Sequence, residues 1–78
     1  MINKYFKLDR KNIALVQFII EGYGEMASVT TIDSKKAIIR ISIIPDFISD
    51  MNNLIEYLKD KYKILEIDNY REIDKDGR

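Results

Sequence analysis

The sequence contains no cysteine, no histidine and no tryptophan, and it has only one proline. Without cysteine the chain has no disulfide and no thiol nucleophile, and without histidine it has no Ser-His-Asp triad and few options for binding a metal. The remaining catalytic option is a pair of carboxylates. Asp46 and Asp50 are four residues apart, as are Glu56 and Asp60, but both pairs lie on predicted solvent-facing helical turns. We therefore expect no enzyme activity, no metal site and no cofactor.

An excess of one charge and a long apolar run are also missing. Thirteen basic residues balance 13 acidic ones, whereas proteins that bind nucleic acids usually carry a basic stripe. The longest nearly apolar run, residues 13–20, is far shorter than the ~20 residues of a membrane span. The N-terminus has no apolar signal core. We expect a cytoplasmic protein, with neither nucleic acid nor membrane as a partner. Its 15 isoleucines against two valines suggest an A+T-rich, bacterial genome.

The chain has 78 residues, 46% of them hydrophobic, which is enough for one domain with a real core. A chain this short removes only about 60% of its unfolded surface from water, so its stability is marginal without further burial. We expect one domain over residues 1–70 and a charged flexible tail over residues 71–78, where six of the eight side chains are charged.

Apolar spacings of three and four predict two helices. The first covers residues 10–21, with Asp9 placed to cap its free amides and Gly22 placed just beyond its end. Phe18 falls on the polar side of this helix and should be at least partly exposed. The second helix covers residues 45–63 and begins at Pro45, where a missing amide hydrogen costs nothing.

Alternating and β-branched segments predict four strands, at residues 4–8, 26–32, 37–44 and 64–69. A three-residue loop, residues 34–36, would join the second and third strands and place Val29 opposite Ile41 on the core face. In the last strand, Leu65 and Ile67 should point inward. The residues expected to be buried are Ile13, Val16, Ile20, Ile39, Ile41, Ile43, Leu54 and Leu58.

The order β-α-β-β-α-β predicts an α+β fold, a ferredoxin-like sandwich with antiparallel sheet order 4-1-3-2 and two helices on one face. The other face would be open and partly apolar, which predicts a homodimer. Either the open faces meet, or the edge strands at residues 26–32 pair into one continuous sheet. The candidate interface residues are Tyr5, Met26, Ile32, Ile38 and Arg40.

Four segments carry a family resemblance: residues 8–14, residues 21–23, residues 27–33 with the following Lys35-Lys36, and residues 45–47. Over about residues 4–68 the chain resembles a small bacterial family, the domain-of-unknown-function family numbered 4911. This resemblance implies a single-domain protein of the same length and no assigned activity.

More distantly, Asp9 and Arg10 resemble the start of the Asp-Arg-Pro-Gly turn of ACT domains, which are small regulatory modules that dimerise and bind amino acids. Lys11 and Asn12 stand where the proline and glycine would be. The resemblance implies a ligand site at Asp9, Arg10, Lys11 and Asn12, against the edge strand of a neighbouring subunit. We therefore expect a small non-catalytic interaction module that self-associates, and the alternative is a sensor of the ACT type that binds a small molecule.

Overall fold

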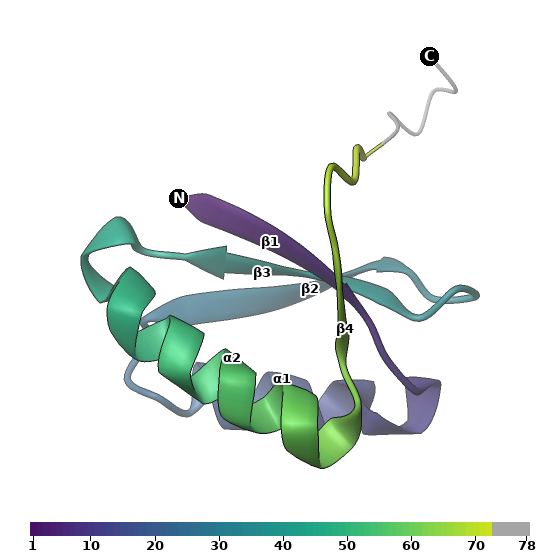
Figure 1. The fold of residues 1–78 in the computed structure, drawn as a ribbon, viewed down its shortest axis with the longest axis horizontal. Coiled ribbons are helices and arrows are strands. Elements are labelled where there is room, and N and C mark those ends of the chain that lie inside the picture. The colour runs from purple at the N-terminus through teal and green to yellow at the C-terminus, as the bar shows by residue number, and fades with distance from the viewer. Residues whose placement is uncertain (73–78) are drawn as a thin grey trace.

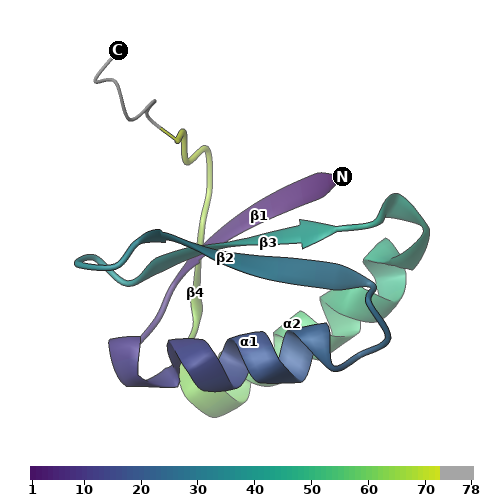
Figure 2. The same ribbon diagram turned by 180° about the vertical axis from the view of Figure 1, so that it is seen from behind.

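Four strands form one antiparallel sheet in the order β2-β3-β1-β4. The computed structural model describes residues 1–72. The strands are β1 (Ile2–Lys7), β2 (Ala27–Asp33), β3 (Ile38–Ile43) and β4 (Leu65–Ile67), and the helices are α1 (Ile13–Glu21) and α2 (Ile48–Tyr62). Both helices lie along one face of the sheet, and the chain after β4 leaves on the opposite side (Figures 1 and 2). The predicted ferredoxin-like α+β fold and its strand order are confirmed.

The core forms where β3 meets the helices. Ile39 and Ile43 are completely buried, and Ile41 is 1% exposed, so one face of β3 is apolar throughout. From the helices, Val16, Ile20, Leu54 and Leu58 pack into the same cluster, as the sequence predicted. Ile13 was expected there too, but it is only half-buried and packs against the cluster from its margin.

The register between β2 and β3 places Val29 opposite Ile41, as predicted. The predicted three-residue loop was wrong, because residues 34–37 form a four-residue turn. A bulge between Thr31 and Asp33 inserts one extra residue in β2. This extra residue compensates for the extra residue of the turn, so the side chains of β2 keep the predicted facing. Val29 therefore still faces the core, where it is buried.

β4 differs from the prediction in its facing. Tyr5 pairs with Ile67 and Lys7 pairs with Leu65, so both apolar residues of β4 lie on the open face, and Leu65 is 66% exposed. Glu66, opposite Phe6, points to the helix side, where Lys59 of α2 binds it. A strand of three residues is too short for its apolar alternation to decide which face its side chains take. The ion pair between Lys59 and Glu66 turns Glu66 toward the helices and so turns Leu65 and Ile67 toward the open face.

The starts of both helices follow the sequence signals. A short 3₁₀ turn, η1 (Arg10–Asn12), precedes α1, and the Asp9 carboxylate caps it by accepting a hydrogen bond from the Lys11 amide at 3.2 Å. A second turn, η2 (Pro45–Phe47), precedes α2 and begins at the proline. Of the predicted tail, residues 73–78 lie outside the described residues.

Replacing Ile41 by alanine should lower the free energy of unfolding by about 2–5 kcal/mol, because it leaves a cavity in the middle of the central strand. Leu65→Ala is the control, since this side chain is mostly exposed and its loss should cost less than about 0.5 kcal/mol. Denaturant unfolding of both variants measures the difference. Equal losses for the two variants would contradict the assigned core.

Candidate functional site

The five candidate interface residues do not form one patch. Tyr5 and Arg40 are cross-strand neighbours in the β1–β3 register and share the open face. Ile38 lies on the same side of β3 but is only 6% exposed, and Ile32 is half-buried at the bulge. Met26 does not share this face, because it packs against the core cluster and lines a groove with side chains from both helices.

On the open face, Tyr5 and Arg40 bind a carboxylate from the end of the described chain. The Tyr5 hydroxyl and Arg40 Nη1 both donate hydrogen bonds to Glu72 Oε2. The ring of Tyr70 lies 5.0 Å from that of Tyr5, measured between centroids. Residues 70–72 therefore cover part of the sheet face that the sequence predicted to be open.

These contacts shift the titration of all three groups. The hydrogen bonds from Tyr5 and then from Arg40 lower the pKa of the Glu72 carboxyl below its ordinary value. The hydrogen bond to Glu72, together with burial, raises the pKa of the Tyr5 hydroxyl, and the same carboxylate raises the pKa of Arg40. Each shift favours the state in which the phenol is neutral and the carboxylate and guanidinium are charged.

The groove that contains Met26 lies between the end of α1, the following turn and α2. Its volume is about 500 Å³, which falls in the range of small-molecule and side-chain binding sites. The apolar lining residues are Ile19, Tyr23, Met26, Leu54 and Tyr57. Asp50 and Asn53 of α2 supply the polar part of the lining.

Several large apolar side chains of the two helices and of the turn after α1 are exposed to solvent. Phe18, one residue before Ile19 on α1, is 76% exposed, as its position on the polar side of the helix predicted. Leu15, three residues before Phe18 on the same helix, is also exposed. We call Leu15, Phe18, Tyr23 and Tyr57, together with the groove, the helical surface.

The residues of the predicted ligand site separate into two groups. Asp9, Lys11 and Asn12 line a hollow of about 300 Å³. Arg10 is not among its lining residues, and its Nη1 instead donates to the Ser34 carbonyl at 3.5 Å. The other lining residues of this hollow come from the end of α2 and are Lys61, Tyr62 and Lys63. Nothing in the sequence placed these residues beside Lys11, because the two segments are far apart in the chain.

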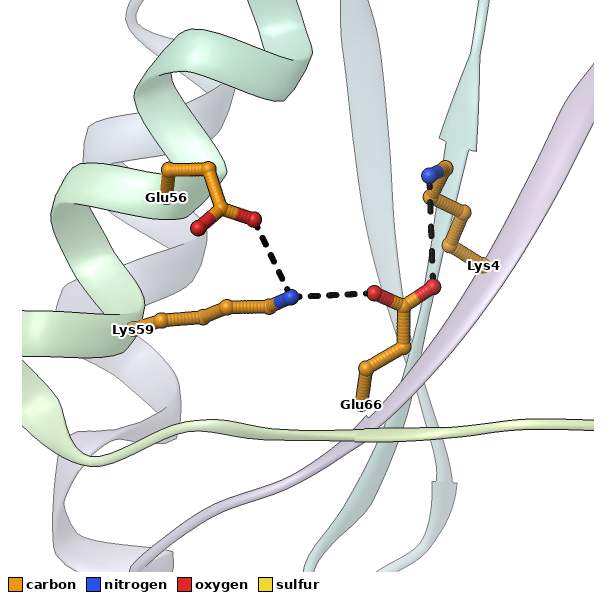
Figure 3. Close-up of polar contacts among 4 residues, drawn as sticks. All are labelled: Lys4, Glu56, Lys59 and Glu66. Carbon is orange, nitrogen blue, oxygen red and sulfur yellow. Dashed lines mark hydrogen bonds and ion pairs between the residues drawn. The ribbon is translucent and has the colours of Figure 1, made fainter.

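A second charged cluster joins α2 to the sheet (Figure 3). Lys59 Nζ lies 3.2 Å from Glu56 Oε2 and 3.1 Å from Glu66 Oε1, and Lys4 Nζ lies 3.9 Å from Glu66 Oε2. The hydrogen bonds to Glu66 and Glu56 raise the pKa of the Lys59 ammonium. An amine that acts as a base or nucleophile needs a lowered pKa, so this cluster attaches β4 to α2 rather than preparing a reactive lysine.

The exposed edge of the sheet at β2 is partly occupied. Glu21, the last residue of α1, accepts a hydrogen bond from the Val29 amide through Oε2 at 2.9 Å. In an edge strand such an amide is a point where a second chain can pair. A dimer that extends the sheet at β2 would have to displace this carboxylate.

One comparison with known proteins gave a match. The family model described as "Domain of unknown function (DUF4911)" matches residues 6–61, which is more than half of the chain. The chain belongs to this family. No curated protein and no solved structure matches the chain. The matched range contains every residue of the groove and of the helical surface, whereas Glu72 lies beyond it.

Within residues 1–72, no group of three or more acidic side chains is placed to hold a metal ion. None of the helices in the same range is long and apolar enough to cross a membrane.

The contact between Glu72 and the open face should depend on pH. Because its pKa in the folded protein is below the ordinary value of 4.5, the contact stabilises the fold above pH 4.5, and the stabilisation is lost as the pH falls through the lowered pKa. Carbon-detected NMR of the Glu72 carboxyl should give a midpoint below 4.5. Arg40→Gln should raise the midpoint, while Arg10→Gln should leave it unchanged. A midpoint at or above the ordinary value in the wild type would contradict the assigned contact.

Proposed function

We propose that this protein is a small, non-catalytic interaction module that self-associates through its helical surface. The observation that carries the proposal is a set of exposed aromatic side chains: Phe18 has 76% of its surface exposed, and Tyr23 and Tyr57 line an apolar groove of about 500 Å³. Scattered exposed apolar residues are ordinary, but an aromatic cluster next to a groove is typical of contact surfaces. The proposal keeps the cytoplasmic location and the homodimer expected from the sequence.

The small size of the chain favours an arrangement that covers its exposed apolar side chains. A 78-residue protein has a small core, and covering an exposed aromatic or leucine side chain contributes about 1.5–3 kcal/mol when burial is complete. In a two-fold dimer each such contact occurs twice, because both copies present the same surface. A stable contact needs more than about 1,000 Å² of total buried area with an apolar centre.

The two arrangements considered from the sequence have less support. On the open face, Tyr5 and Arg40 already bind Glu72, and Ile38 has little surface left to bury. At the sheet edge, Glu21 occupies the Val29 amide. Both arrangements would first have to break contacts within the monomer, whereas the helical surface is exposed as it stands.

Phe18→Glu should dissociate the dimer, because it places an unpaired charge at the centre of the contact. Leu65→Glu is the matched control, since Leu65 is similarly exposed but lies on the open face at β4. Light scattering should give twice the chain mass of 9.2 kDa for the wild type and for Leu65→Glu, and the monomer mass for Phe18→Glu. A wild-type monomer at high micromolar concentration would refute self-association, and dissociation by Leu65→Glu alone would move the contact to the open face.

A second candidate function is the ACT-type sensor, and one observation favours it. Three lysines, Lys11, Lys61 and Lys63, line the same hollow as Asp9 and Asn12. A ligand carboxylate could pair with these ammonium groups while Asn12 supplies a hydrogen bond. This site would take a small anionic molecule such as an amino acid.

A thermal-shift screen against amino acids and nucleotides tests the sensor. A true ligand should stabilise the protein by about 2.7 kcal/mol at a hundredfold excess over its dissociation constant. Lys11→Gln should reduce this stabilisation, while Lys35→Gln, in the hairpin turn, should not. The sensor is refuted if no compound stabilises the wild type, or if both variants respond as the wild type does.

A further inference from the structure

Arg40 lies on β3, and its side chain faces the open side of the sheet. One of its hydrogen-bond donors has no acceptor. Among the described residues, its Nε is buried and forms no hydrogen bond. The side chain as a whole is 28% exposed, so a group that displaces residues 70–72 can reach the guanidinium. A buried donor without an acceptor is costly, and a guanidinium binds a carboxylate best through two parallel hydrogen bonds.

The segment that now covers this site uses only part of it. Glu72 binds the guanidinium through Nη1 and shares the same oxygen with the Tyr5 hydroxyl, which leaves Nε unsatisfied. Tyr70 packs on Tyr5 with a 36° tilt between the rings. The occupants of the site are thus an aromatic ring and a carboxylate, two residues apart in an irregular stretch of chain.

From this geometry we infer that the open face at Tyr5 and Arg40 is a docking site for a peptide segment of a partner protein. The segment would carry an aromatic side chain for Tyr5 and a carboxylate for Arg40. Residues 70–72 occupy this site in the structure and would compete with the partner segment for it. This inference goes beyond the proposed self-association, which uses the opposite side of the molecule.

The resident segment is suited to exchange. It follows a turn at Asp68 and Asn69, and Glu72 is exposed, so an exposed ion pair of small net strength contributes to its attachment. Its tether gives it an effective concentration in the millimolar range, which a free peptide must overcome. A partner carboxylate that also accepts a hydrogen bond from Nε would satisfy a donor that Glu72 leaves free.

The probe for this site is a peptide with the sequence of residues 68–72, capped at both ends and added to the full-length chain. Glu72→Ala removes the resident carboxylate, so this variant should bind the peptide at least about tenfold more tightly than the wild type. Nitrogen-15 NMR follows the Arg40 Nε–H signal, which should shift as the peptide carboxylate binds the guanidinium in place of the Glu72 carboxylate.

Two double variants provide the matched comparison. In the Glu72→Ala background, Arg40→Gln should abolish binding, while Arg10→Gln removes the same charge elsewhere and should leave binding intact. Circular dichroism first checks that each variant is folded. Equal binding by wild type and Glu72→Ala, equal binding by the two double variants, or no shift of the Arg40 Nε–H signal would each overturn the inference. None of these outcomes bears on self-association, which light scattering measures separately.

Discussion

The alternation of side chains along β3, held in register by β1 on one side and β2 on the other, determines the character of both faces of the sheet. Ile39, Ile41 and Ile43 face the helices and are buried, so the intervening Arg40 must face the other way. A shift by one residue would bury the guanidinium and expose three isoleucines. The same register therefore produces both the core and the charged centre of the open face.

Both helices cover the same face of the four-stranded sheet, so this small protein presents two different surfaces. The open face is closed in part by the chain itself, through Glu72 and Tyr70. The helical surface, by contrast, leaves Phe18 and its groove to solvent. This difference is why we assign self-association to the helices and a competitive peptide site to the sheet.

The features that the sequence predicted correctly are local ones. The isoleucine alternation in β3, the Asp9 cap and the exposure of Phe18 each depend on residues a few positions apart. The features it missed depend on contacts between distant segments. Lys59 of α2 draws Glu66 to the helix side and turns Leu65 outward. Within the candidate sites, the pairing of Arg40 with Glu72 joins residues 32 positions apart, for which no periodic pattern exists.

Self-association through the helical surface can be measured by an NMR dilution series. Between low micromolar and millimolar concentration, the amide signals of Phe18, Tyr23 and Tyr57 should shift together along one binding curve. The signals of Tyr5 and Arg40 should stay fixed, because the open face takes no part in the contact. Self-association would be contradicted if the spectra did not change with concentration and the protein tumbled as a 9.2 kDa monomer. Shifts confined to Tyr5 and Arg40 would contradict the assignment of the contact to the helical surface.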